Sequence, residues 1–397
     1  MLRRLVPLAL AVSVFACAED EGDPVCGTSP GSAPHVDVSL GPCEQLSSYR
    51  FMKGFDADGR HVWNDGVVPY DLNTPLFSDY TVKLRAVYVP PDSAPTPWRP
   101  QGEESIDRAF DFPVGSVLIK TFAVADDLRD ADSPIDVIET RLLVHTDKGW
   151  RAHTYIWNED RTDAERRAIG RAGVELEWTH TDGTRRRTED YLIPSERDCR
   201  NCHGSGTSGL RLLGPRAPQM LGRSALSSWQ ADGIVAAEPA SHELEPFPQW
   251  NADGTLVTPL DEMDGATLDW HARTYLDSNC AACHNPTGNT EGAGLDFRAH
   301  VRDVLRLGIC KIPSAAGSEA QGGRAHDVVP GEPDRSVLIF RVESSYTDWD
   351  HANRRMPPRG RSIPHDEGAA LLRRWIEWLG TEEAQAAYPG LEDRVCE

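Results

Sequence analysis

Two short strings constrain this chain of 397 residues more than any other feature. Residues 199–203 read Cys-Arg-Asn-Cys-His and residues 280–284 read Cys-Ala-Ala-Cys-His. Each has the C-x-x-C-H spacing of covalent haem attachment, in which two thiols bond to the vinyl groups of one porphyrin and the His ligates its iron. Two such strings rarely arise by chance in one chain. We therefore expect two covalently bound haem c groups, held by Cys199, Cys202, His203, Cys280, Cys283 and His284.

A zinc site made of four cysteines is the main alternative for two C-x-x-C pairs. The gap from Cys202 to Cys280 is far longer than the usual spacing between zinc-binding pairs. The histidine that follows each pair has no role in such a site. The spacing therefore favours haem over zinc.

Met356 is the expected sixth ligand of the second haem iron. It follows His284 in chain order and is flanked by Arg355, Pro357 and Pro358, just before the last predicted helix. Prolines restrict the backbone and would hold the sulfur in place. A methionine that fills a gap in an apolar core is the alternative.

The sixth ligand of the first haem stays open. Met220 and Met263 follow His203 in the chain, and either could instead fill a core gap. The other options are a histidine, a lysine or no ligand at all. The unassigned histidines include His153, His180, His242 and His271. A closed sixth position favours electron transfer, whereas an open position would allow peroxide or small-ligand chemistry.

Two arginine clusters could bind haem propionates through forked hydrogen bonds. The first precedes the first haem string and comprises Arg185, Arg186 and Arg187. The second surrounds Met356 and comprises Arg354, Arg355, Arg359 and Arg361. A solvated surface is the alternative for both clusters.

The N-terminus predicts export from the cytoplasm. Arg3 and Arg4 precede an apolar run that is too short to span a bilayer and ends at Cys17. A small residue before cysteine resembles a bacterial lipoprotein processing site, and plain secretion is the alternative. We interpret residues 1–17 as a signal or lipoprotein peptide and residues 18–44 as an acidic tether. The predicted location is the periplasm or an outer-membrane lipoprotein, which agrees with haem attachment outside the cytoplasm.

The formal net charge of −21 bears on the partner. It argues against nucleic acid, because phosphate binding needs a basic surface. It permits docking to a basic redox partner protein, donor or acceptor, since complementary fields speed encounter. An acidic surface that only keeps the protein soluble is the alternative, and the sequence leaves the oligomeric state open.

Four of the nine cysteines remain after the haem strings and Cys17 are set aside. Four cysteines in an oxidising compartment allow three pairings. We prefer the pairs that would close the two ends of the mature chain, namely Cys26–Cys43 and Cys310–Cys396. One bridge with two free thiols is the alternative.

The chain changes texture near residue 193. Residues 45–192 predict a β-rich, sandwich-like domain, because short runs such as 82–89 alternate at period two, although residues 160–169 read as a helix. Residues 193–263 would form a first haem module, with a short helix over 224–232. Residues 264–397 would form a cytochrome c-like second haem domain, with helices over 266–279 and 366–379. The predicted fold class is therefore α+β multidomain, a β-rich domain followed by mainly α-helical haem modules.

Five further strings occur together in one group of proteins. They are residues 70–80, 112–115, 139–143, 308–311 and 327–331. On these strings the chain, over roughly residues 45–380, resembles a family of exported bacterial di-haem c-type cytochromes that is largely uncharacterised. The resemblance implies a haem on each C-x-x-C-H string and Met356 as a haem ligand. The family usually has Leu at the position of Met220, and the resemblance says little about any substrate.

Two functions follow from these expectations. The first is electron transfer between a donor and an acceptor in the periplasm or at the cell surface. The alternative is a haem redox enzyme, a peroxidase or small-molecule dehydrogenase, that uses an open first haem. The β-rich domain could shape a substrate pocket or dock a partner. The sequence predicts no set of catalytic bases beside either haem string, so enzyme activity stays an open question.

Overall fold

The computed structural model describes residues 26, 33–39, 41–97, 109–204, 209–237, 244–314, 321–345 and 355–397. Several sequence predictions fall elsewhere. The signal peptide with Cys17, most of the tether, His242 and Arg354 lie outside the described residues.

The largest element is a six-stranded antiparallel sheet with the strand order β3-β4-β5-β6-β7-β8. Its strands are β3 (Val67–Pro69), β4 (Val82–Tyr88), β5 (Val117–Ala125), β6 (Ile135–Thr146), β7 (Gly149–Trp157) and β8 (Ala164–Arg166). Neighbouring strands follow one another in the chain, so the sheet is a simple meander. The run at 82–89 predicted β4 because its alternation matches the period of a strand.

Alternate residues of each strand point to opposite faces of this sheet. One face carries Arg85, Lys120 and Arg141, and we call it the motif face because the segment that follows the first C-x-x-C-H string packs against it. The opposite face, which we call the far face, carries Ile119 and Leu142, both fully buried.

Two small hairpin sheets cover the two faces. They consist of β1 (Met52–Phe55) with β2 (His61–Trp63), and of β9 (Arg171–Thr179) with β10 (Arg185–Ile193). The β1–β2 hairpin lies on the far face, where His61 Nε2 is 2.8 Å from Thr121 Oγ1. The β9–β10 hairpin lies on the motif face, where the Tyr191 hydroxyl donates to Glu139 (2.8 Å).

The helix predicted over residues 160–169 is wrong. Residues 164–166 form β8, which pairs with β7 and closes one edge of the large sheet. Ala164 is fully buried in the far-face core, and Asp163 binds the backbone and hydroxyl of Ser47 (3.0 and 2.5 Å). Pairing with β7 and these distant contacts therefore outweigh the local helical pattern.

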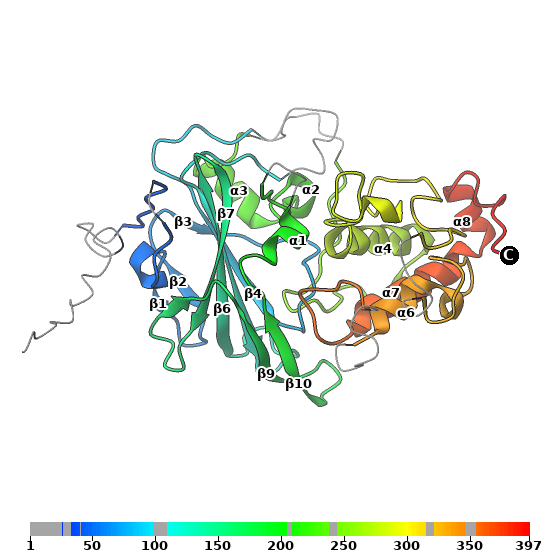
Figure 1. Ribbon diagram of the computed structural model, residues 1–397, viewed down its shortest axis with the longest axis horizontal. Coiled ribbons are helices and arrows are strands. Elements are labelled where there is room, and N and C mark those ends of the chain that lie inside the picture. Colours follow the sequence, from blue (N-terminus) through cyan, green and yellow to red (C-terminus); the bar gives the residue numbers. More distant parts are fainter. Residues whose placement is uncertain are drawn as a thin grey trace, which may run out of the picture.

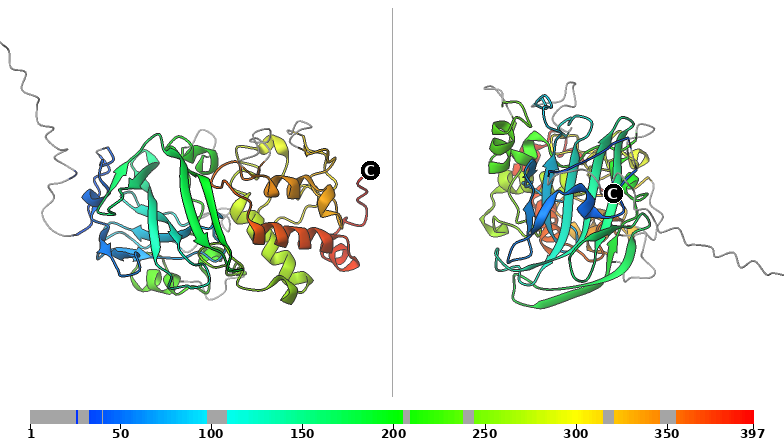
Figure 2. Two further views of the ribbon diagram at one scale, coloured as in Figure 1. Left: turned by 90° about the horizontal axis from the view of Figure 1, so that it is seen from below. Right: turned by 90° about the vertical axis from the view of Figure 1, so that its left-hand side faces the viewer.

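The helices occupy the second half of the chain. The described α-helices are α1 (Cys199–His203), α2 (Ala217–Met220), α3 (Ser224–Ala231), α4 (Gly265–Asn279), α6 (Val337–Glu343), α7 (Asp366–Leu379) and α8 (Glu382–Ala387). Short 3₁₀ turns are η1 (Leu46–Tyr49), η3 (Leu260–Glu262), η4 (Glu291–Ala293) and η5 (Pro333–Arg335). Helices α1 to α3 lie beside the large sheet, whereas α4, α6, α7 and α8 gather at the other end of the molecule (Figures 1 and 2).

The predicted fold class, with mainly α-helical haem modules, is wrong. In the described part of the chain, the strands of three sheets hold more residues than the seven α-helices. Helices α1, α2 and α3 have only five, four and eight residues, and irregular loops fill much of the chain between α4 and α6. Glycines such as Gly308 and Gly331 adopt positive φ (84° and 79°) in these loops, a conformation that ends helical runs.

The two longest helices, α4 and α7, pack against each other as the sequence periodicity indicates. Leu268, Ala272 and Leu276 of α4 are buried in one apolar cluster with α7. A Cβ atom at Gly368 would lie 2.3 Å from the Tyr275 hydroxyl, so glycine there permits the close approach.

Candidate functional site

The first C-x-x-C-H string forms α1, and the segments on both sides of it are anchored to β7. His153 Nδ1 is 3.2 Å from a carboxylate oxygen of Glu196, three residues before Cys199. Beyond the string, Leu210 makes an isolated β-bridge to Trp150. These contacts on both sides of α1 fix the string against the sheet.

His203 has the hydrogen bonding of a metal ligand. Its Nδ1 is 2.8 Å from the carbonyl oxygen of Arg211, which can only accept, so Nδ1 carries the hydrogen and Nε2 keeps its lone pair. Burial, helped by the positive charges of Lys120 and Arg141, lowers the pKa of His203 to about 4. The ring is therefore neutral at pH 7, as iron ligation requires.

His284 has the same tautomer for a related reason. The Thr290 hydroxyl donates its hydrogen to the carbonyl of Cys283 (2.7 Å). It must therefore accept from His284 Nδ1, 3.3 Å away, which leaves Nε2 with its lone pair. Burial lowers the pKa of His284 to about 4, so this ring is also neutral at pH 7.

The four cysteines of the two strings are free thiols, whereas the other described cysteines form the pairs Cys26–Cys43 and Cys310–Cys396. These are the two pairings that we preferred from the sequence, and their formation in the protein stays a prediction. Burial raises the pKa of Cys199 to about 11 and that of Cys280 to about 12, so both side chains are protonated thiols at pH 7.

No metal-ion site built from side chains alone occurs within the described ranges. Three or more His, Cys, Asp or Glu side chains do not gather there in a way that could hold an ion. The four thiols are thus not assembled as a Cys₄ zinc site would require. A haem needs only axial ligands from the protein, because the porphyrin supplies the other four nitrogen atoms.

The two C-x-x-C-H strings contact each other directly, although they are far apart in sequence. The thiol of Cys283 lies 3.2 Å from the carbonyl oxygen of Asn201. Arg211 donates to the carbonyl of Ala282 (2.8 Å), and Asn289 donates to the Asn201 carbonyl (3.0 Å). The chain therefore brings its two candidate attachment sites together.

Met356 lies in a loop beside α6 and near the second string. The Met356 N–H donates to the carbonyl of Arg341 (2.8 Å), and the Arg361 side chain donates to the carbonyl of Met356 (2.7 Å). The charge of Arg341 also contributes to the lowered pKa of His284. The Met356 backbone and the His284 ring therefore both lie around Arg341. Ligation by the Met356 sulfur stays a prediction.

The arginine clusters noted in the sequence have other partners. Arg185, Arg186 and Arg187 form ion pairs with Asp126 (2.8 Å), Asp182 (3.0 Å) and Glu189 (3.1 Å) on the surface of the β9–β10 hairpin. In the second cluster, Arg361 donates to the carbonyls of Met356, Ser344, Ile363 and Arg341. Arg355 donates to the Pro358 carbonyl (3.0 Å), and Arg359 is 3.7 Å from Asp198. These side chains organise loops and surface.

The candidate ligands of the first haem are dispersed. Met220 is fully buried in an apolar cluster with Trp229 of α3. Met263 is buried in the other helical cluster, with α4 and α7. His180 packs edge-on against Tyr80 with ring centroids 4.8 Å apart, and His271 is buried on α4. The sixth ligand of the first haem stays open.

One loop, residues 70–81 between β3 and β4, contacts three segments that are far apart in the chain. Asn73 donates to the carbonyl of Leu221, just after α2 (2.9 Å). The N–H of Phe77 donates to Asn279, the residue before Cys280 (2.8 Å). Asp79 accepts hydrogen bonds from the segment that follows Met356. The family-like string at 70–80 therefore corresponds to the element that connects the end of α2, the second C-x-x-C-H string and the Met356 loop.

The sequence patterns did not single out a row of bases on the motif face. Arg85, Lys120 and Arg141 stand directly opposite one another on β4, β5 and β6. Burial lowers the pKa of Arg85, whereas Glu139 raises that of Arg141 although burial alone would lower it. The available signal was a charge at alternating positions of strongly apolar strands, as in Lys83-Leu84-Arg85.

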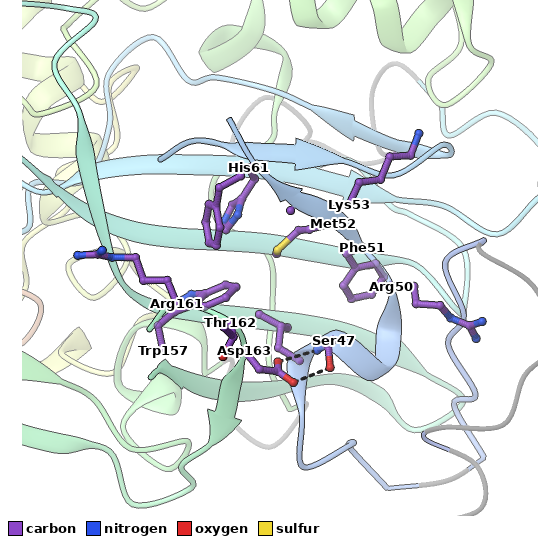
Figure 3. A pocket seen from close by; sticks show the side chains of 13 residues that line it. Ser47, Arg50, Phe51, Met52, Lys53, His61, Trp157, Arg161, Thr162 and Asp163 are labelled. Atoms are coloured by element: carbon purple, nitrogen blue, oxygen red, sulfur yellow. Dashed lines mark hydrogen bonds between the residues drawn. The ribbon is translucent and has the colours of Figure 1, made fainter. Parts of the chain in front are cut away.

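A cavity of about 360 Å³ lies on the other side of the molecule. Phe51, His61, Trp157, Arg161 and Asp163 are among the residues that line it, between the β1–β2 hairpin, η1 and the end of β7 (Figure 3). Neither C-x-x-C-H string contributes to its lining. We therefore treat it as separate from the candidate haem sites.

Comparisons with models of protein families, with curated proteins and with solved structures found no match to this chain. The resemblance to di-haem c-type cytochromes therefore stays a prediction from the sequence strings. In the part of the chain that the structure describes, every helix is too short or too polar to cross a bilayer.

Proposed function

We propose that this chain is a di-haem c-type cytochrome that transfers electrons outside the cytoplasm. Cys199 and Cys202 would hold one haem, with His203 as its proximal ligand. The second haem would be held by Cys280 and Cys283 and ligated by His284 and Met356. When bound, each haem supplies a one-electron redox couple.

The observation that carries the proposal is the shared state of the two histidines. His203 and His284 follow their cysteine pairs, both give Nδ1–H to an oxygen acceptor, and both are neutral at pH 7. A proximal haem ligand needs this tautomer and this charge, since the other ring nitrogen must bind iron. Two independent sequence strings arrive at the same arrangement through different acceptors.

The contact between the strings favours transfer from one haem to the other. Arg211 links the loop after the first string to Ala282 inside the second string. Groups attached at the two strings would therefore share one junction of the chain. The acidic chain would dock a basic redox partner, and Cys17 would carry a lipid anchor in the periplasm or at the outer membrane.

A haem redox enzyme is the alternative, and one observation favours it. Met220 and Met263 are both buried in apolar clusters, and Met356 is the ligand proposed for the second haem. The first haem would then have an open sixth position unless a histidine or lysine closes it. An open position would permit reaction with peroxide or another small substrate.

Haem attachment is tested by mass spectrometry of the full chain, made in a host that has c-type maturation machinery. The wild type should carry the mass of two haems, the Cys199→Ser/Cys202→Ser variant one, and the Cys280→Ser/Cys283→Ser variant one. Cys310→Ser/Cys396→Ser is the matched control and should keep both haems. Absence of covalent haem from the wild type would refute the proposal.

Spectra of the same holoprotein separate the two functions. Two six-coordinate low-spin haems that do not react with peroxide or carbon monoxide would support electron transfer. A high-spin fraction that reacts with peroxide would support the enzyme. Magnetic and optical spectra of the oxidised and reduced protein provide this measurement.

A further inference from the structure

Three bases on the motif face form an arrangement that is unfavourable without a counter-ion. In the strand register, Arg85 of β4 stands directly opposite Lys120 of β5, and Lys120 stands directly opposite Arg141 of β6. Like charges directly opposite on neighbouring strands repel each other. We call these three residues the basic row. Lys83, also buried, lies on the same face one step further along β4.

The carboxylates around the basic row do not balance its charge. Glu139 forms an ion pair with Arg141 (2.5 Å). Asp71 is 4.0 Å from Arg85, but its side chain is 62% exposed. Lys120 has no carboxylate within ion-pair distance among the residues that the structure describes, and its Nζ lies 4.7 Å from the ring centroid of Phe122.

Arg85 provides the clearest sign of a missing partner. The residue is only 4% exposed, and its Nη2 atom is buried without a hydrogen-bond acceptor. An unsatisfied buried guanidinium is costly, since it loses its hydration without compensation. An anion with oxygen acceptors would satisfy Arg85 and relieve the repulsion along the row.

The segment just after the first C-x-x-C-H string packs on the same face as this row, since Leu210 and Leu212 share an apolar cluster with Leu118 and Leu143. The charges of Lys120 and Arg141 both act on His203 and on the thiol of Cys202. A group attached to Cys202 and ligated by His203 would therefore lie within the field of the row. Arg361 in the Met356 loop differs, because it already donates to the backbone carbonyls of Met356, Ser344 and Ile363.

We propose that the basic row is a carboxylate-binding site that faces the first haem. The inference rests on the proposed function in one respect, that the haem on Cys199 and Cys202 would bring two propionate carboxylates to this face. A small free carboxylate that enters the same place is the other source. In both cases the guanidinium of Arg85 and the ammonium of Lys120 supply the hydrogen bonds and charge.

The first test measures the reduction potentials of both haems in the holoprotein. Lys120→Met removes one positive charge from the row, and Lys53→Met removes one from β1 on the far side of the sheet. Positive charge near a haem favours the reduced iron, so Lys120→Met should lower the potential of one haem only. The ratio of reduced to oxidised form should fall roughly tenfold for a charge about 10 Å away, which is about 59 mV for one electron.

Two further variants keep this test interpretable. Lys120→Arg retains the charge and should restore the wild-type potential. Arg85→Met removes a different charge of the same row and should shift the same haem in the same direction, should Lys120→Met fail to fold. A row that only stabilises the sheet would change the unfolding temperature in these variants without moving a potential.

The second test identifies the source of the carboxylate. Acetate is titrated into wild-type holoprotein in a buffer free of other carboxylates. A saturable change of the first haem spectrum, absent in Lys120→Met, would show that free carboxylate binds the row. If acetate has no effect while Lys120→Met shifts the potential, the propionates are the ligand.

Failure of the row and failure of the proposed function give different results. Without covalent haem the proposed function fails, but acetate should still raise the unfolding temperature of the wild type more than that of Lys120→Met. Carboxylate binding by the basic row is refuted if Lys120→Met and Lys53→Met have the same reduction potentials and acetate changes neither the haem spectrum nor the unfolding temperature.

Discussion

Asp79 is the residue whose replacement should release the Met356 loop. Its side chain is buried, with the residue 1% exposed, and it accepts hydrogen bonds from the Ser362 N–H (2.7 Å), the Ser362 hydroxyl (2.9 Å) and the Ile363 N–H (3.1 Å). Burial raises the pKa of Asp79, while these three donors act against the rise. The carboxylate thus connects the β3–β4 loop to the chain six residues after Met356.

The cost of Asp79→Asn follows from this geometry. The amide keeps one acceptor oxygen and replaces the other by an NH₂ group, which cannot accept. Both backbone N–H groups donate to Oδ1 (2.7 Å from Ser362 and 3.1 Å from Ile363), and the Ser362 N–H also lies 2.9 Å from Oδ2. An NH₂ group in place of Oδ2 would face this N–H donor against donor, and it can turn away only by giving up a buried hydrogen bond. A buried donor left unsatisfied costs about 1–3 kcal/mol. If that cost falls on the closed loop, the open population rises roughly 5–150-fold.

Hydrogen exchange over residues 355–363 measures the loop directly and does not depend on haem. Asp79→Asn should speed exchange there, and in the holoprotein one haem should lose low-spin character. Asp65→Asn is the matched control, since its carboxylate is 94% exposed and makes one surface ion pair with Lys53. Exchange in Asp79→Asn no faster than in Asp65→Asn would refute the role assigned to Asp79.

Three further predictions concern ligation, disulfides and pH. Met356→Ala should remove low-spin character from one haem only in optical and magnetic spectra, and an unchanged spectrum removes Met356 from the ligand set. Peptide mapping without reductant should recover the pairs Cys26–Cys43 and Cys310–Cys396. Burial lowers the pKa of His365 to about 3, so the unfolded state binds the extra proton below its own pKa near 6.5. His365 alone should therefore lower the free energy of unfolding by about 1.4 kcal/mol per pH unit as pH drops from 6.5 toward 3, and urea titrations should find the total slope smaller by about that amount in His365→Gln.

The sequence predicted the elements that local chemistry decides. Alternation over 82–89 matches β4, and the apolar stripe of 266–279 matches α4, which Asp264 caps by accepting from the Thr267 N–H (2.8 Å). The two C-x-x-C-H strings are also read from local spacing, and the haem groups that this spacing predicts stay a prediction. Such features need no knowledge of distant residues.

The features that the sequence did not predict depend on distant pairing. Strand β10 is rich in charge, and its pairing with β9 and its packing on the motif face come from tertiary contacts. The basic row exists only because Arg85, Lys120 and Arg141 share one register across three strands. The prediction of mainly helical modules around the C-x-x-C-H strings was wrong for a related reason. Loops held by distant contacts occupy positions where composition alone would allow helices.

The β3–β4 loop connects the β-rich domain to the segments around the two C-x-x-C-H strings. Within seven residues, Asn73, Phe77 and Asp79 bind the end of α2, the residue before Cys280 and the loop after Met356. Asp79 and Tyr80 adopt positive φ (49° and 57°), a costly conformation for residues other than glycine that persists only where the surroundings hold it. Because strands β3 and β4 fix both ends of the loop, the large sheet sets the positions of these three segments at once. The β-rich domain therefore positions the segments that form the candidate haem sites, and its motif face borders the first of these sites.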